Sequence, residues 1–445
     1  MIFVKRLIRA IILAIFINCV YIIYATHVNT FIKITAAAVL FAAYVHINMR
    51  PRKSEIDARK LKALIGGYEL TLLASFCLIF ECLLYVAYIV LYGLYPNVFI
   101  LVINGVVCLL LVAITLIGGL ARIFIGSGQL GAKNRLLIIF LWWAPVVNIV
   151  LFYQCCRCAR LEYEFELAKL KRNRLRKDQM VCKTKYPILM VHGIFFRDWK
   201  LFDYWGRIPD ELRENGADIY YGNQQSSTSV ELSAIEIEKR IKEVVNETGC
   251  DKVNIIAHSK GGLDARYAIS ALGAGRRVAS LTTINTPHMG CAFAGKLIDM
   301  TPAKLVATLG KKYESLFAKL GDSAPDFFGG VSELTLEKCA ELNEKVIDDD
   351  SVVYQSAGSK MASASASPFP LSVGYRMIEP LEGENDGLVA TKSMAWGKFL
   401  GIVDPPGKTG ISHGDMIDLT RKNIYGFDVT EFYVDLARGL KERGL

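Results

Sequence analysis

The sequence predicts an α/β fold with a mainly parallel sheet covered by helices, preceded by an all-helical apolar region. Two observations support this division. Long apolar runs occur almost only in residues 1–156. After residue 184, short apolar runs that end at small residues alternate with amphipathic segments, which is typical of buried parallel strands and their covering helices. The length of 445 residues allows two or three domains of about 150 residues each.

The apolar excess belongs to the first part of the chain. Hydrophobic residues make up 52% of the sequence, and the mean hydropathy is +0.31, which is high for one soluble domain. Five apolar runs lie near residues 7–24, 30–48, 68–92, 97–120 and 136–155. Each approaches the ~20 residues that a helix needs to cross a bilayer, and several in series exclude a single cleaved signal peptide. We therefore expect four or five transmembrane spans within residues 1–156.

Basic loops indicate the orientation of these spans. The connections at 25–29 and 93–96 carry no Lys or Arg, whereas those at 49–66 and 121–135 are basic. The positive-inside rule places the basic loops and the N-terminus in the cytoplasm. The fifth run leaves two alternatives for the rest of the chain. Its length favours crossing to the outside, whereas the basic stretch 157–177 favours the cytoplasmic face.

The net charge of +9 indicates contact with lipid headgroups rather than with nucleic acid. Basic residues gather beside the apolar runs, at 50–62 and 169–177, where they set topology or meet anionic lipids. The sequence has no zinc-finger spacing, recognition-helix pattern or basic stripe interleaved with aromatics. Seven of the eleven cysteines lie at or before Cys158, and the other four are widely separated. This pattern predicts free thiols rather than a disulfide framework or a metal site.

Residues 157–183 read as a basic helical linker, and residues 184–445 as one α/β domain. Strands are expected near 186–193, 252–257 and 279–285, with helices at 230–247 and 261–272.

The segment from Val253 to Gly262 carries the predicted nucleophile. A buried strand runs directly into His-Ser-Lys-Gly, and a helix follows. This is the pattern of a nucleophile elbow, where Ser259 occupies a sharp, strained turn and small residues are needed two positions away on each side. Gly261 fits, and Ala257 is a mild departure from the usual glycine. The alternative is an ordinary strand-to-helix loop rich in small residues.

A serine nucleophile needs a base, and elimination among six histidines leaves His413. The other five lie in the apolar region, in the two motif loops, or in a loop that follows a strand; these are His27, His46, His192, His258 and His288. The side chain of His258 is expected to point away from the serine. His413 stands in a polar loop before the last helix, and its alternative interpretation is an exposed loop histidine.

The orienting acid should fall between serine and base in the sequence. Asp386 meets this requirement in a turn that we expect after a strand ending near Ile378. It would hold the imidazole in the correct tautomer. Asp348–Asp350 and Asp404 compete for this role, and Asn-Asp-Gly can also be a simple turn. For the oxyanion, we expect backbone N–H groups from Ile194, after the first strand, and from Lys260, after the nucleophile.

These segments together resemble the bacterial triacylglycerol lipases of the α/β-hydrolase fold. The matching stretches span residues 184–445 in the family's order: 186–193, 253–262, 281–290, 385–389 and 413–415. The resemblance implies ester hydrolysis through an acyl-enzyme, and a helical lid within about 292–335. The apolar side chains expected to line an acyl site there are Phe293, Leu297, Leu305, Leu309, Phe317, Phe327 and Phe328; the alternative is plain helix packing.

The resemblance has limits. Some secreted members of the family hold a structural calcium; Asp415 fits one ligand position, but no Asp occurs from 352 to 385, so we expect no metal. The resulting hypothesis is a membrane-anchored, cofactor-free serine hydrolase of lipid esters, in contact with membrane lipids. An acyltransferase or thioesterase with the same triad is an alternative. An alternative of another class is a non-catalytic membrane binding or transport protein with a hydrolase-like module.

Overall fold

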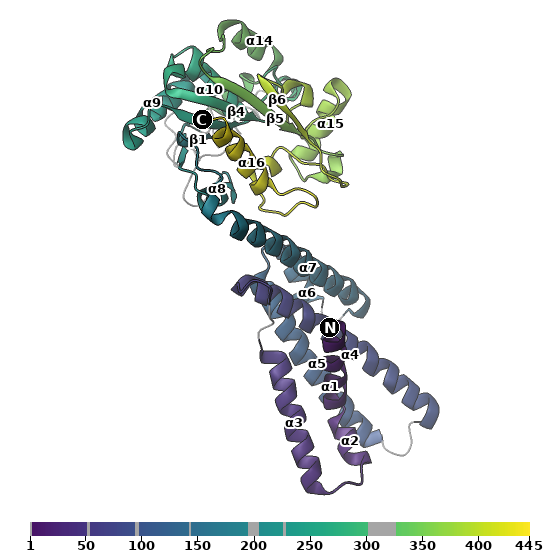
Figure 1. The fold of residues 1–445 in the computed structure, drawn as a ribbon. Helices are drawn as coiled ribbons and strands as arrows, with labels where there is room; N and C mark the ends of the chain where they lie inside the picture. The colour runs from purple at the N-terminus through teal and green to yellow at the C-terminus, as the bar shows by residue number, and fades with distance from the viewer. Residues whose placement is uncertain are drawn as a thin grey trace. The chain divides into compact units, whose positions relative to one another are not determined.

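A computed structural model of the protein describes residues 2–50, 54–93, 98–141, 144–194, 204–225, 228–300 and 326–445. The chain divides into two compact units, Met1–Arg174 and Leu175–Leu445 (Figure 1). The first unit is all helical, and the second is built around a sheet.

The described residues of the first unit form seven helices. They are α1 (Ile2–Ile17), α2 (Cys19–Ala25), α3 (Thr30–Met49), α4 (Arg59–Tyr92), α5 (Val98–Gly126), α6 (Ala132–Phe140) and α7 (Pro145–Arg176), whose last two residues belong to the second unit. Among the described residues, α3, α4 and α5 are long and apolar enough to cross a membrane. The helices α1 and α2 meet at a 64° bend and could form a fourth, broken span. The predicted fifth run is divided between α6 and α7.

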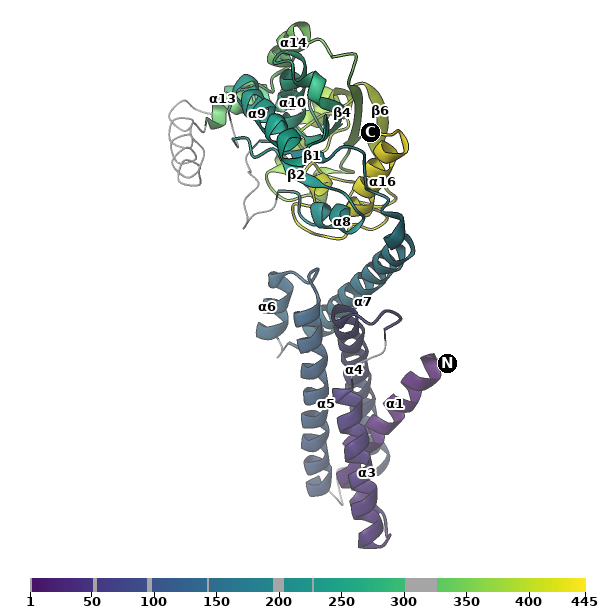
Figure 2. The ribbon, with the colours of Figure 1, turned by 60° about the vertical axis from the view of Figure 1, so that its left-hand side comes forward.

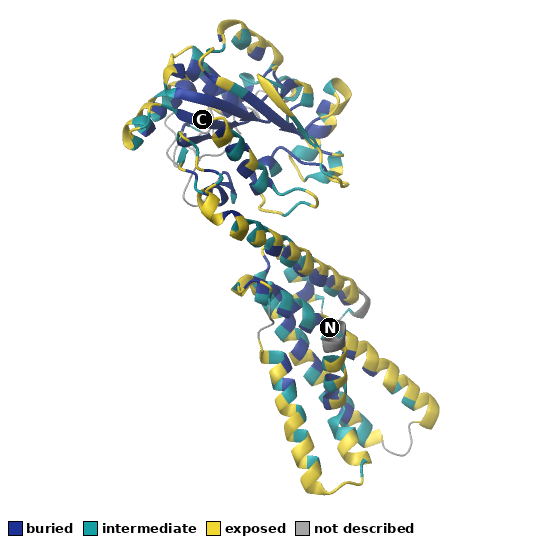
Figure 3. Ribbon diagram, viewed as in Figure 1, coloured by how far each residue is buried: buried dark blue, intermediate teal, exposed yellow. Residues whose placement is uncertain are grey.

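The outer faces of these helices are apolar. Phe31 of α3 is 76% exposed, Val90 of α4 is 77% exposed, and Phe99 of α5 is 75% exposed. Figure 3 shows the exposed surface extending along α3 and α4. Such faces are costly in water and match the hydrocarbon of a bilayer.

Glycine allows α4 and α5 to approach closely. A Cβ atom added at Gly119 would lie 2.6 Å from Thr71 Oγ1 and 2.8 Å from Thr71 N. A Cβ at Gly67 would lie 2.8 Å from the carbonyl oxygen of Gly119. Because each position also meets a backbone atom of the facing helix, neither can take a larger side chain without separating the helices.

Polar side chains meet in the interior of the same unit. Asn18, at the bend between α1 and α2, donates to Glu81 Oε1 at 2.7 Å. Asn104 of α5 donates to Asn18 Oδ1 and to the hydroxyl of Tyr85, both at 2.9 Å. These bonds tie the bend to α4 and α5.

The second unit contains a six-stranded, fully parallel sheet in the order β2-β1-β3-β4-β5-β6. The strands are β1 (Ile188–Val191), β2 (Ile219–Tyr221), β3 (Val253–His258), β4 (Val278–Ile284), β5 (Val353–Ser359) and β6 (Lys398–Val403). The predicted fold class is therefore confirmed, as are the predicted strands β1, β3 and β4.

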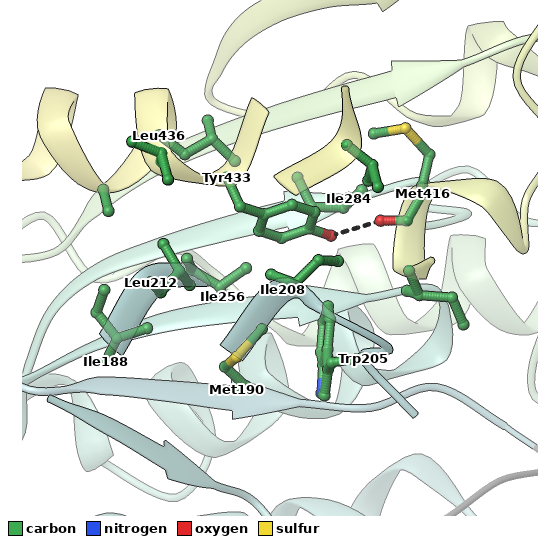
Figure 4. Packing of buried hydrophobic residues seen from close by; sticks show 14 of the residues in the cluster. Ile188, Met190, Trp205, Ile208, Leu212, Ile256, Ile284, Met416, Tyr433 and Leu436 are labelled. Atoms are coloured by element: carbon green, nitrogen blue, oxygen red, sulfur yellow. Dashed lines mark hydrogen bonds between the residues drawn. The ribbon is translucent and has the colours of Figure 1, made fainter. Parts of the chain in front are cut away.

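Helices cover both faces of this sheet. On one face, α8 (Ile208–Glu214) and α16 (Val429–Glu442) pack on Ile188, Met190 and Ile256 (Figure 4). On the other, α9 (Val230–Thr248) and α10 (Lys260–Ser270) pack side by side on the residues that alternate with these (Figure 2). Because successive side chains of each buried strand point to opposite faces of the sheet, the strands contribute to two separate apolar cores.

The remaining described α-helices of the second unit are α11 (Ala292–Met300), α13 (Phe327–Ser332), α14 (Leu336–Lys345) and α15 (Leu371–Glu382). The last of these corrects the sequence analysis, because the strand expected to end near Ile378 is a helix. Its buried residues Gly374, Tyr375 and Ile378 recur at helical spacing, although Pro380 lies inside the helix.

Candidate active site

Ser259 lies at the sharp turn between β3 and α10. Its φ of 56° and ψ of −133° put a residue with a Cβ atom in a region that glycine favours. Such a conformation costs about 1–3 kcal/mol and persists only where the surrounding structure imposes it. The buried strand and the helix that follows impose it here, and they leave Ser259 only 5% exposed.

Two glycines let the end of β1 approach this turn. A Cβ at Gly261 would lie 2.9 Å from the carbonyl oxygen of Val191. A Cβ at Gly193 would lie 2.8 Å from Ser259 Cβ. Both positions therefore require glycine, and the loop after β1 lies directly against the serine.

The predicted oxyanion donors flank the serine on these two segments. Ile194 follows Gly193 and is 8% exposed. Lys260 is the first residue of α10, where main-chain N–H groups have no acceptor within the helix. Its side chain is turned inward, 2.6 Å from Asp264 Oδ1 and 3.2 Å from Ser233 Oγ.

His413 and Asp386 meet in a buried pair. His413 Nδ1 lies 2.6 Å from Asp386 Oδ2, and the main-chain N–H of His413 donates to the Asp386 carbonyl at 2.9 Å. His413 is 7% exposed and Asp386 is 0% exposed. Two contacts between the same residues hold the imidazole plane and the loop together.

The Asp386 carboxylate receives three further hydrogen bonds. Its Oδ1 atom accepts from the N–H groups of Leu388 at 2.9 Å and Val389 at 2.7 Å. Its Oδ2 atom accepts from Asn285 Nδ2 at 2.5 Å. Donors of this kind stabilise an ionised carboxylate away from water. The geometry suits a carboxylate held in one orientation beside a histidine.

Asn285 is a site residue that the sequence analysis did not identify. It follows β4 with a φ of 49°, and its amide also donates to Ser359 Oγ at 2.7 Å. The available signal was an asparagine directly after a buried strand, because the carboxyl ends of parallel strands gather at one edge of the sheet.

His258 lies beside the candidate base. Its ring packs on the ring of His413, with centroids 4.5 Å apart, a contact that the sequence analysis did not predict. Strand alternation explains this placement, since Ala257 faces the α9 and α10 core while His258 faces the opposite side, against Tyr204 and Trp205.

The competing acids are engaged elsewhere. Asp348 accepts from Trp396 Nε1 at 2.7 Å, and Asp404 pairs with Lys360 at 3.1 Å. Asp415 accepts from the Ser412 hydroxyl at 2.6 Å, within its own loop. Across the described ranges, no group of three or more His, Cys, Asp or Glu residues could hold a metal ion.

The described residues do not contain all of the expected site: one hydrogen bond is not formed, and part of the expected lid lies outside them. Within the described residues, no hydrogen bond joins the Ser259 hydroxyl to His413; such bonds often tighten only when substrate binds. Of the expected lid, α11 and α13 are helical, whereas residues 301–325 lie outside the described residues, together with Leu305, Leu309 and Phe317. The side chains of Leu297 and Phe327 are not described either.

A parallel sheet with a serine at a strand-to-helix turn, and an aspartate and a histidine in later loops, defines the α/β-hydrolase class. The family model described as "Putative serine esterase (DUF676)" matches residues 212–321. By sequence, the second unit is similar to triacylglycerol lipases, and part of it matches the serine esterase family model.

Proteins from several organisms that are similar in sequence are named triacylglycerol lipases. A triacylglycerol lipase of Pseudarthrobacter phenanthrenivorans is 34% identical over 172 residues, which cover 36% of this chain and 53% of the relative. That of Vibrio cholerae is 29% identical over 291 residues, covering 60% and 91%. That of Pseudomonas fragi is 27% identical over 300 residues, covering 59% and 98%. The chain spans about half the length of the relatives that it matches at 34% identity.

Solved structures show a similar coverage. The Staphylococcus hyicus lipase has a TM-score of 0.47 and 18% identity, and the match covers 59% of this chain and 97% of that one.

Proposed function

We propose that the protein is a membrane-anchored serine hydrolase that cleaves carboxylic esters of lipids. The observation that carries the proposal is the buried His413–Asp386 pair. Like the strained Ser259, both residues come after strands of the parallel sheet, at its carboxyl-terminal edge. A strained serine alone can be a tight turn. A histidine oriented by a fully hydrogen-bonded carboxylate is the partner that turns such a serine into a nucleophile.

In this mechanism, Ser259 Oγ attacks the ester carbonyl while His413 Nε2 takes the hydroxyl proton. The charge that forms on the carbonyl oxygen is held by the main-chain N–H groups of Ile194 and Lys260. The imidazolium then protonates the leaving alcohol, and the acyl group remains on Ser259. A water molecule, deprotonated by His413, releases the acid, while Asp386 steadies the imidazolium throughout.

The relatives and the first unit together support a lipid ester as substrate. The matching relatives are named triacylglycerol lipases. The apolar helices α3, α4 and α5 of this chain would hold it in a bilayer, where lipid esters are concentrated. The anchor raises the local substrate concentration without adding a catalytic group.

A fluorophosphonate probe tests the proposal, because it reacts with serines that a neighbouring base activates. We expect the full-length protein in detergent to be labelled, and Ser259→Ala and His413→Ala to lose labelling. Ser280→Ala is a matched control: Ser280 is also a buried serine, on β4, where it donates to Asn254 at 2.7 Å far from the base. It should label like the wild type.

Hydrolysis of triacylglycerol and phospholipid in mixed micelles then identifies the ester. An unlabelled but folded wild type, or labelling that persists in Ser259→Ala, would contradict the proposal.

A further inference from the structure

Two histidine rings touch in the site, and only one of them belongs to the proposed mechanism. The ring of His258 is 0% exposed and packs on that of His413, with an angle of 53° between the planes. His413 must gain and lose a proton in each catalytic cycle. A second imidazole in van der Waals contact would oppose this cycle if it were charged, because like charges at this distance repel.

The hydroxyl of Tyr204 lies 2.7 Å from His258 Nδ1. The same oxygen accepts the main-chain N–H of Gly193 at 2.9 Å. With a donor already directed at this oxygen, the phenol is well oriented to give its own proton to Nδ1. That bond leaves the single proton of a neutral His258 on Nε2.

The surroundings of His258 favour the neutral ring. Burial and the nearby His413 both lower the pKa of His258 well below its usual value. The main chain of His413 acts in the opposite direction and raises this pKa. Nε2 has no partner at hydrogen-bond distance within the described part of the chain.

We propose that Tyr204 and His258 are positioning residues, in which the Tyr204 hydroxyl holds His258 as the neutral Nε2–H tautomer and this ring supports the catalytic His413. The inference rests on the proposed function. The Tyr204 hydroxyl would then act at two places in the site. It accepts the N–H of Gly193, beside the expected oxyanion donor Ile194, and it determines which nitrogen of His258 carries the proton. The part of the sequence that supplies it is Tyr204-Trp205, outside every recognised motif.

The first experiment compares Tyr204→Phe with Tyr433→Phe in the full-length protein. Tyr433 is a matched control, because it is a buried tyrosine that packs on the same Trp205 and whose hydroxyl donates to the Met416 carbonyl at 3.0 Å. Both variants lose one buried hydroxyl, so their thermal stabilities should fall by similar amounts. For hydrolysis of p-nitrophenyl butyrate, Tyr204→Phe should lower kcat at least tenfold with KM within twofold, whereas Tyr433→Phe should leave kcat unchanged.

A kcat for Tyr204→Phe within twofold of the wild type would overturn the proposal, as would an equal loss in Tyr433→Phe. If Tyr204→Phe does not fold, His258→Gln and His258→Phe replace it. Gln retains an amide that can bond to Tyr204, so it should keep at least fivefold more kcat than Phe. Equal values for the two would also overturn the proposal.

The tautomer is measured directly by nitrogen-15 NMR of histidine-labelled protein, with the His258 signals assigned from their absence in His258→Gln. We expect the proton on Nε2 at pH 7, and a proton on Nδ1 would overturn the proposal whatever the activity. If the wild type is not labelled by fluorophosphonate, the proposed function has failed. If it is labelled and Tyr204→Phe behaves like Tyr433→Phe, only this inference has failed.

Discussion

The two units of the chain differ in which side chains they expose and which they bury. The helical unit exposes large apolar side chains, such as Phe31 at 76% and Phe99 at 75%, and gathers polar side chains inside. The sheet unit buries apolar residues in two cores, one on each face of the sheet. The first surface matches the hydrocarbon of a bilayer and the second matches water, as the proposed membrane anchor requires.

Buried carboxyl groups make the comparison specific. Asp386 receives four hydrogen bonds to its carboxylate, from His413, Asn285 and two main-chain N–H groups. Glu81 is bonded to Asn18, and its Oε2 atom has no partner among the described residues. The first arrangement suits the orienting role that we propose for Asp386, whereas the second links helices. Four predictions test this contrast, from the largest effect to the smallest.

The largest effect is expected from Asp386→Asn. The amide cannot fix the same imidazole tautomer, so kcat should fall by about 10⁴-fold while the fold is retained. The counterpart in the other unit, Glu81→Gln, keeps an oxygen for Asn18 and should leave kcat unchanged. Ester hydrolysis with circular dichroism as a folding control measures both. A kcat above one tenth of the wild type in Asp386→Asn would contradict the assignment.

The buried pair of Lys260 and Asp264 should control stability next. Burial raises the pKa of Asp264 to about 7, although Lys260 acts to lower it. Replacing Asp264 by Leu leaves the buried ammonium of Lys260 without its partner and should lower the free energy of unfolding by about 3–5 kcal/mol. The double variant Lys260→Met with Asp264→Leu should recover most of this loss.

The urea concentration that halves fluorophosphonate labelling reports this stability for the sheet unit alone. In the exposed Lys338–Glu341 pair, Glu341→Gln should change the free energy of unfolding by less than about 1 kcal/mol. Equal effects at the two pairs would remove the distinction between buried and exposed charge.

Acid should destabilise the sheet unit through two buried histidines. Burial lowers the pKa of both His258 and His288 well below 6.5; the first ring is enclosed by Tyr204, Trp205 and His413, the second by Arg266 and Trp396. In the unfolded chain both imidazoles bind protons below about pH 6.5. The contribution of these two rings to the free energy of unfolding is therefore fully present above that pH and is lost as the pH falls below it.

The two rings together should contribute a loss of up to about 2.7 kcal/mol per pH unit. Urea midpoints between pH 7 and 5.5 measure the slope, and His288→Gln should reduce it by about half. A midpoint that does not change with pH over this range would show that the native rings also take protons.

The smallest effect concerns the helical unit. Gly119→Val should separate α4 from α5 and cost about 1–3 kcal/mol, because the new Cβ meets the Thr71 backbone. Gly118→Ala is its control, since a Cβ there has no neighbour within 4 Å. Thermal unfolding in detergent measures both, while fluorophosphonate labelling at 25 °C should stay normal. If the two variants lose equal stability, close helix contact is not what holds this unit together.

The sequence predicted the features that depend on local pattern. Alternating buried strands and helices gave the fold class, and apolar length gave the candidate spans. A serine between a strand and a helix gave the turn at Ser259. The helix α15 was missed because Gly374 and Pro380 both argue against a helix, although packing of its buried face outweighs their cost.

Contacts between distant residues could not be predicted in the same way. Asn285 meets Asp386 across 101 residues, and Tyr204 meets His258 across 54. Such pairs form only once the sheet has brought its strand ends together. The bend at Asn18 is similar, because its hydrogen bonds to Glu81 and Asn104 come from other helices.

The strained backbone at Ser259 has an evolutionary consequence. Glycine would relax this turn and stabilise the native protein by about 1 kcal/mol or more, so under the proposed function selection for chemistry opposes selection for stability at this position. In a descendant that no longer needs the proposed reaction, drift at this position has a favoured direction. A homologue with glycine here, and an otherwise intact sheet, would mark a lineage in which that reaction has been lost and only binding remains.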